Sequence, residues 1–376
     1  MQKNMEILQN MLRALVSLLS LAVLVFGQQL HSQPLRPNAN FHFTNVTNSN
    51  RIMEVNPRFI QKGRRILYLE FVGKPFAPQP WDYRLVMVNQ DGSDKIALET
   101  TGVIDYNVRP DDQSVLLLKS PTAVQFTSND DLASSIFDWE IWNLSLLNGE
   151  KVLLESSSGL PLSEGYRILG RSEIPAGQLP EFRTTSPKNT FQMVLRRTQS
   201  DGSLRVTFTL IQSNGMEQEI FRTECWKSYS DLEWQPSVIW LDESHFITLG
   251  FVSNVQARFP QSEGLFSIVR IDLQNASQEI LYSDAEIRPF PKFVLNPTAT
   301  ELYFQKANAE KGTAELWKLN LLLKGAELVY WVNGDLGEPR FSNDGRSFVF
   351  TRLMNNNFDI LRADLDREYF LRVASE

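Results

Sequence analysis

Residues 140–146 read Glu-Ile-Trp-Asn-Leu-Ser-Leu, and residues 315–321 repeat this pattern as Glu-Leu-Trp-Lys-Leu-Asn-Leu. Looser copies lie at residues 85–89, 267–273 and 359–365. Alternation of apolar and polar residues predicts a β-strand, and a strand that returns every few tens of residues is typical of a repeat architecture. The repeated strand therefore indicates the fold class before any single motif is considered.

The repeated unit contains four predicted strands and is clearest at the end of the chain. There the strands are predicted at residues 338–342, 347–351, 358–365 and 369–373. The tight turn after the first of them is Asn343-Asp344-Gly345, in which glycine supplies the positive φ. Earlier copies of the unit begin near residues 56, 106, 181, 234 and 288. Repetition of a four-stranded unit predicts an all-β, six-bladed β-propeller of antiparallel blades over residues 56–376.

The segment at residues 338–346, Glu-Pro-Arg-Phe-Ser-Asn-Asp-Gly-Arg, resembles the repeat of TolB-type β-propellers, and residues 56–59 and 108–113 are partial copies of it. The resemblance implies a six-bladed propeller outside the cytoplasm that acts by binding other proteins. TolB itself carries an α/β domain ahead of its propeller. Here only residues 28–55 separate the apolar N-terminal run from the first repeat, so we expect a stand-alone relative. The family's repeat is structural and transfers no catalytic residues.

The N-terminus has the pattern of an export signal. Lys3 and Arg13 precede an apolar run at residues 14–26, which spans about 20 Å as a helix and is shorter than the bilayer core. We predict a cleaved signal peptide at residues 1–27, with Gln28 as the new terminus, and a periplasmic or secreted protein. An uncleaved anchor is the alternative. Residues 28–55 are expected to be a leader, which either adds an extra edge strand or lies free.

Charge and cysteine content narrow the classes of partner. The net charge of −7 disfavours binding to nucleic acid or to an acidic membrane surface, because both need an excess of Lys and Arg. Cys225 is the only cysteine, so an intramolecular disulfide is excluded. We therefore expect a protein partner, no nucleic acid, and a chain that is monomeric by itself.

The sequence offers no recognisable catalytic set. Its three histidines, His31, His42 and His245, show no metal-ligand spacing, and no nucleophile elbow or phosphate-binding glycine loop occurs. Asn129-Asp130-Asp131 matches no cation-loop spacing, and a solvated acidic loop is the simpler interpretation. We predict no metal, no cofactor and no enzymatic activity.

The predicted binding surface lies on the long connections between strands. These connections all fall on one face of a propeller, and the loop at residues 73–81 combines proline with aromatic residues. We predict Phe76, Trp81, Asp82 and Tyr83 as partner-binding residues. The alternative is that Phe76 and Trp81 fold back over the blade edge. Trp142 and Trp317 occupy equivalent repeat positions, which predicts packing between blades.

Three functions remain compatible with these observations. The first is a non-enzymatic platform for protein–protein interaction in the cell envelope. The second is a carbohydrate-binding or carbohydrate-active propeller that uses its central channel, motivated by the acidic and aromatic-rich composition. The third is a structural subunit whose face is permanently covered in a larger assembly.

Overall fold

Strands dominate the part of the chain that the computed structural model describes. This part comprises residues 38–49, 52–71, 83–121, 136–161, 165, 168–169, 181–200, 203–212, 215–226, 238–253, 264–284, 287, 293–308, 312–355 and 357–366. The segment Asn38–Glu376 forms one unit by its internal contacts. A helix of the length and apolar character needed to cross a membrane does not occur among the described residues.

The strands form five antiparallel sheets, and most strands pair with their neighbours in the chain. The first sheet contains β2 (Glu54–Ile60), β3 (Arg65–Phe71), β4 (Tyr83–Asn89), β5 (Ile96–Val108), β6 (Ser114–Lys119), β7 (Ile136–Ser145) and β8 (Lys151–Pro161). The second contains β9 (Glu181–Thr185), β10 (Gln192–Ser200), β11 (Ser203–Ile211) and β12 (Glu217–Trp226). The third contains β13 (Ile239–Trp240), β14 (His245–Ser253), β15 (Gly264–Asp272) and β16 (Ser277–Ser283).

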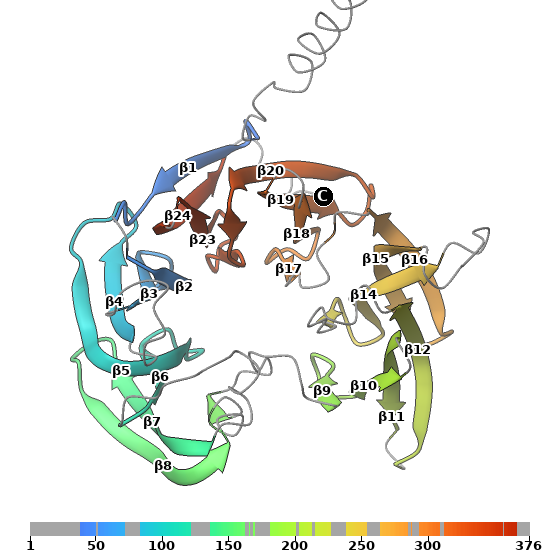
Figure 1. Ribbon diagram of the computed structural model, residues 1–376, viewed down its shortest axis with the longest axis horizontal. Coiled ribbons are helices and arrows are strands. Elements are labelled where there is room, and N and C mark those ends of the chain that lie inside the picture. The colour runs from blue at the N-terminus through green and yellow to red at the C-terminus, as the bar shows by residue number, and fades with distance from the viewer. Residues whose placement is uncertain are drawn as a thin grey trace, which may run out of the picture. The chain divides into compact units, whose positions relative to one another are not determined.

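The last two sheets complete the series. The fourth contains β17 (Val294–Leu295), β18 (Glu301–Asn308), β19 (Thr313–Asn320) and β20 (Ala326–Asn333). The fifth contains β21 (Asp335–Leu336), β22 (Arg340–Phe341), β23 (Ser347–Met354), β24 (Asn357–Leu365) and β1 (Phe41–Asn45). Figure 1 shows the sheets of this unit following one another in chain order.

The seven-stranded sheet joins two repeat units through one long strand. The first part of β5 pairs with β4, from Ile96 to Val103, and its last part pairs with β6, from Val103 to Val108. Strand β5 is therefore the outer strand of one four-stranded group and the inner strand of the next. The prediction of an all-β propeller of four-stranded antiparallel units is confirmed, but the sequence placed a boundary near residue 106 where the strand is continuous.

Aromatic side chains fill the space between neighbouring sheets. Phe208 of β11 stacks on Phe246 of β14, with ring centroids 6.0 Å apart. Tyr303 of β18 meets Phe341 of β22 edge to face at 4.9 Å. The middle strands are consequently buried on both faces, as in β3, where residues 66–70 are all buried. Phenylalanine suits these strands, because each sheet needs large apolar groups on two faces.

An N-terminal strand completes the last sheet. Strand β1 pairs antiparallel with β24, from Phe41 opposite Leu365 to Asn45 opposite Leu361. The Val46 N–H then donates to the Ile360 carbonyl at 2.8 Å, after which the chain continues to β2 in the first sheet. An extra edge strand was one of the two alternatives that the sequence left open for this region. The predicted strand at residues 369–373 lies outside the described residues.

Gly92 allows the β4–β5 turn to approach this junction closely. Its φ is +86°, and a Cβ added there would lie 2.3 Å from the Val46 carbonyl oxygen. We expect Gly92→Ala to lower the free energy of unfolding by more than about 2 kcal/mol, because the strain of positive φ adds to a backbone clash. Chemical denaturation followed by circular dichroism measures the change.

Gly215→Ala is the matched control, since Gly215 has a φ of +80° but nothing within 4 Å of an added Cβ. It should show only the penalty of the positive φ, about 1 kcal/mol. Equal losses in the two variants would contradict the role of close approach at Gly92.

Candidate functional site: the leucine turns

The repeated sequence pattern forms the third strand of two four-stranded groups, β7 and β19. In both, the indole Nε1–H donates to the glutamate two residues earlier, from Trp142 to Glu140 at 2.7 Å and from Trp317 to Glu315 at 2.8 Å. A register shift against the fourth strand follows at the tryptophan in each case. Both indoles pack against core clusters, as the sequence predicted. The repeat therefore encodes one local structure at two places.

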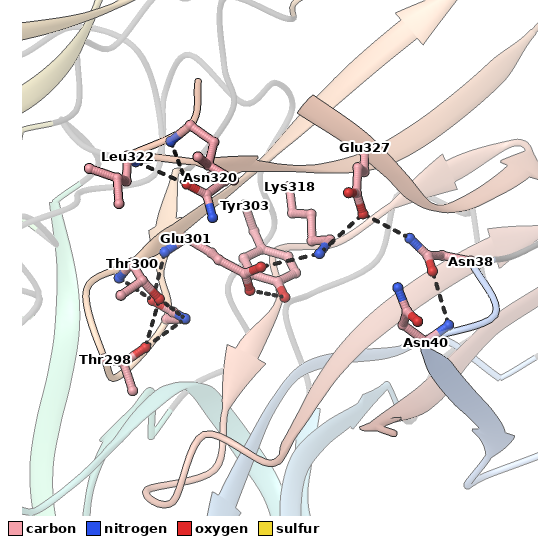
Figure 2. A network of polar contacts seen from close by, with 12 residues as sticks. Asn38, Asn40, Thr298, Thr300, Glu301, Tyr303, Lys318, Asn320, Leu322 and Glu327 are labelled. Atoms are coloured by element: carbon pink, nitrogen blue, oxygen red, sulfur yellow. Dashed lines mark hydrogen bonds and ion pairs between the residues drawn. The ribbon is translucent and has the colours of Figure 1, made fainter. Parts of the chain in front are cut away.

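Each pattern ends in a turn that a polar side chain caps. The Ser145 hydroxyl accepts from the Leu147 N–H at 3.3 Å, and the Asn320 carboxamide oxygen accepts from the N–H groups of Leu322 and Leu323 at 3.0 and 2.7 Å. Figure 2 shows the Asn320 side chain bonded to the backbone of Leu322. A side chain that bonds to the backbone of its own turn fixes the turn.

These two turns present leucine side chains to solvent. Leu147 is 73% exposed, Leu322 78% and Leu323 73%. The first leucine of each turn is not exposed in this way: Leu146 is buried, and Leu321 packs against a core cluster. We call residues 146–150 and 321–325 the leucine turns. Their exposed apolar groups are held on an ordered backbone, which suits an interface better than a flexible loop does.

The leucine turns lie at the same end of their sheets as the turns between first and second strands. The Leu146 N–H donates to the Gln113 carbonyl at 2.8 Å, and the Leu321 N–H donates to the Thr300 carbonyl at 3.0 Å. The two four-stranded groups of the first sheet are linked at this end as well, because the Lys62 N–H donates to the Asp112 carboxylate. We call this end the turn face. It is the opposite end of β3 and β4 from the Phe71–Tyr83 pair.

Buried ionic groups support the leucine turn of the fourth sheet. The Lys318 ammonium lies 3.1 Å from the Glu301 carboxylate and 3.2 Å from Glu327, and the Lys318 and Glu301 side chains are almost completely buried. The Tyr303 hydroxyl donates to Glu301 at 3.2 Å, and Asn38 donates to Glu327 at 3.4 Å. Figure 2 shows these groups converging from β18, β19, β20 and the segment before β1.

This network needs a neutral tyrosine and a charged lysine. Burial raises the pKa of Tyr303 well above its ordinary value, and the Glu301 carboxylate adds to the rise, so the phenol stays protonated and donates. The network ties the segment before β1, through Asn38, to β19 and β20, the two strands that flank Leu322 and Leu323. These polar contacts therefore hold in place the strands on either side of the leucine turn.

Another polar feature of the turn face is a shallow pocket of about 340 Å³, lined by Arg64, Asn89, Gln90, Asp91 and Arg362. Arg362 is held by Asp364 at 2.6 Å, and Asp91 contributes a second carboxylate. Two arginines and two carboxylates leave the pocket without a clear charge preference. It does not by itself indicate a ligand class.

The structure corrects one of the four predicted contact residues. Tyr83 begins β4, is only 6% exposed, and packs its ring against Phe71 with centroids 5.4 Å apart. Burial raises the pKa of its hydroxyl to about 12. Tyr83 therefore belongs to the core and cannot act as a surface anchor. Phe76, Trp81 and Asp82 lie outside the described residues, as do Asn129, Asp130 and Asp131.

Sequence reasoning missed the leucine turns, although a signal was present. An exposed turn normally carries polar residues or glycine, so leucine directly after a Ser or Asn cap is unusual.

Among the described residues, no three His, Cys, Asp or Glu side chains come together in a way that could hold a metal ion. His245 contacts Asp242 at 2.9 Å within its own turn, which is a local structural contact.

Comparisons with known proteins find only distant structural similarity. No family model and no curated protein matches the chain. The oligogalacturonate lyase of Vibrio parahaemolyticus is similar in structure, with 12% identity and a TM-score of 0.40 over 89% of this chain and 100% of that one. A protein described as TolB from Agrobacterium tumefaciens has 13% identity and a TM-score of 0.39 over 77% and 87%. The β-propeller domain of the Trilobed protease from Pyrococcus furiosus has 11% identity and a TM-score of 0.34 over 83% and 82%.

Proposed function

We propose that this propeller is exported and serves as a non-enzymatic platform that binds a protein partner in the cell envelope through the leucine turns. The observation that carries the proposal is the pair of capped turns with Leu147, Leu322 and Leu323 exposed. Leaving these side chains in water is unfavourable, and covering them with a partner removes that penalty. Because the turns are already ordered, binding does not carry the entropy cost of immobilising them.

Further parts of the proposal come from the sequence and from the strand pairing. We take residues 1–27 as the export signal, which places the chain in the periplasm or outside the cell. We count six blades by dividing the first sheet at β5 into two groups of four strands and treating each remaining sheet as one blade. We also propose that the chain is a stand-alone TolB-type propeller, on the strength of the repeat at residues 338–346.

The leucine turns can be tested by a cross-linked pull-down from the native envelope. We expect a protein retained by the wild type to be lost when Leu322→Ser and Leu323→Ser are combined, with the captured amount falling about ten-fold or more. Both side chains are exposed in the free protein, so the melting temperature should not change.

Leu265→Ser is the matched control, because Leu265 is also an exposed leucine but lies at the start of β15, away from the turn face. It should retain the partner. If all three proteins capture the same set, the leucine turns are not the binding surface. If no protein is captured specifically by any of them, the platform function itself is wrong.

A further inference from the structure

Strand β8 presents an outer edge that differs from those of the second, third and fourth sheets. It runs for 11 residues, pairs only with β7 among the described strands, and ends the seven-stranded sheet. Val152, Leu153 and Leu154 follow one another along it and are 48%, 44% and 52% exposed. A long, apolar and unpaired edge is a template for further strand pairing.

The outer strands of the second, third and fourth sheets carry protection that residues 152–154 of β8 lack. Strand β12 has Glu219, Arg222 and Glu224 along its length. In β16, Glu279 is held by Arg270 and Lys324. The Val329 carbonyl of β20 accepts from the Asn38 N–H at 3.3 Å. Charges and added chain are the usual means of blocking an edge, and residues 152–154 have neither.

The sequence of β8 is complementary to itself in the antiparallel direction. If two copies pair about Leu153, Lys151 of one copy lies opposite Glu155 of the other, Val152 lies opposite Leu154, and Leu153 meets its own counterpart. Both ends of such a ladder then carry an ion pair of opposite charges. Lys151 contacts Glu99 at 2.7 Å, but Lys119 also reaches that carboxylate at 3.2 Å, so Glu99 keeps a partner if Lys151 turns outward.

A register shift at Leu154 does not set β8 apart. Comparable shifts occur where the third and fourth strands pair in the second, third and fourth sheets, so they belong to the repeat. What distinguishes β8 is the uncharged apolar run between Lys151 and Glu155. An extended peptide of another protein could also pair with this edge of β8. Only a second copy of the chain is certain to bring the matching charge pattern.

We infer that two copies of this chain associate edge to edge through β8, with a two-fold axis at Leu153. The interface is isologous, as in most homodimers, because the same residues of both copies meet. It lengthens the seven-stranded sheet across the axis. This inference departs from the monomer expected from the sequence and is independent of the partner proposed for the leucine turns.

The oligomeric state of the purified full chain tests whether this dimer forms. We expect light scattering after size-exclusion chromatography to show a dimer that dissociates on dilution. Leu153→Lys and Leu153→Glu should each be monomeric, because two like charges meet at the axis, with dimer affinity weakened on the order of 100-fold. Mixing the two variants should restore a dimer, because opposite charges then face each other.

Ile280→Lys is the matched control, since Ile280 is a half-exposed residue of the outer strand β16. It should dimerise like the wild type. A wild type that stays monomeric at about 100 μM overturns the inference, as does a mixture of the two oppositely charged Leu153 variants that remains monomeric. Loss of the dimer in Ile280→Lys would also overturn it. A pull-down that depends on Leu322 and Leu323 survives all of these outcomes.

Discussion

Replacing Lys318 with methionine is expected to lower the free energy of unfolding by about 3–5 kcal/mol, the largest effect that we predict for a single substitution. Lys318 is 5% exposed at its side chain and Glu301 only 2%, and they lie 3.1 Å apart. Methionine fills the space but removes the charge, so the buried Glu301 carboxylate loses the ammonium beside it. Removing one member of a buried ion pair is strongly destabilising, because the other member stays buried.

Two further variants separate the effect of burying a charge on the free energy of unfolding from the effect of losing a lysine side chain. Lys324→Met removes a lysine from an ion pair with Glu279 in which both side chains are substantially exposed, and it should cost less than about 1 kcal/mol. Lys318→Met combined with Glu301→Gln removes both charges and should recover much of the loss. Urea denaturation measures all three, and equal effects at Lys318 and Lys324 would show that burial is unimportant here.

Glu54→Gln is expected to stabilise the protein more as the pH rises, by up to about 3 kcal/mol at pH 8 relative to pH 5. Glu54 is completely buried at the start of β2, directly opposite Glu70 of β3. Burial raises its pKa from 4.5 to about 7, while the Thr47 hydroxyl and the Lys95 ammonium only partly oppose the rise. The nearest described cation, Lys95, is 3.9 Å away and lies closer to Glu70.

The direction of this pH dependence follows from the raised pKa of Glu54. Below pH 4.5 the carboxyl is neutral in both folded and unfolded chains, so folding carries no penalty from it. Between pH 4.5 and about 7 the unfolded chain loses its proton first, and the folded state loses stability until both are ionised. Glutamine stays neutral throughout and avoids this loss. The wild type and the variant should therefore be compared by urea denaturation at several values between pH 5 and 8.

Glu217→Gln provides the contrast, because Glu217 is exposed and paired with Arg196, whose hydrogen bond lowers the pKa of Glu217. The effect of Glu217→Gln on stability should be constant between pH 5 and 8, since the Glu217 carboxyl is ionised there in both the folded and the unfolded chain. A difference between wild type and Glu54→Gln that does not vary with pH would show that Glu54 is already charged in the folded protein.

Local signals in the sequence predicted most of the strands and turns. The turn Asn343-Asp344-Gly345 is present, with Gly345 at a φ of +70° and Asp344 accepting from the Arg346 N–H. The equivalence of Trp142 and Trp317 also holds, down to their bonds with Glu140 and Glu315. These features depend on contacts within a few residues, which is why the sequence pattern contains them.

Burial and pairing between distant segments could not be predicted in the same way. Tyr83 looked like part of an aromatic loop, but β4 begins there and its neighbours in β3 and β5 cover the ring. Lys318 and Glu301 lie on neighbouring strands, and their near-complete burial follows from how the strands pack. Asn38 reaches Glu327 across 289 residues of sequence.

The sequence by itself determined the repeat, the strand periodicity, the turn residues and the absence of a familiar catalytic motif, because each is set by short-range backbone and side-chain chemistry. The tertiary structure decided that β1 completes the last sheet, that Tyr83 is core, and that Leu147, Leu322, Leu323 and the edge of β8 remain exposed. Exposure depends on which surfaces other segments cover, and that is known only when all sheets are in place.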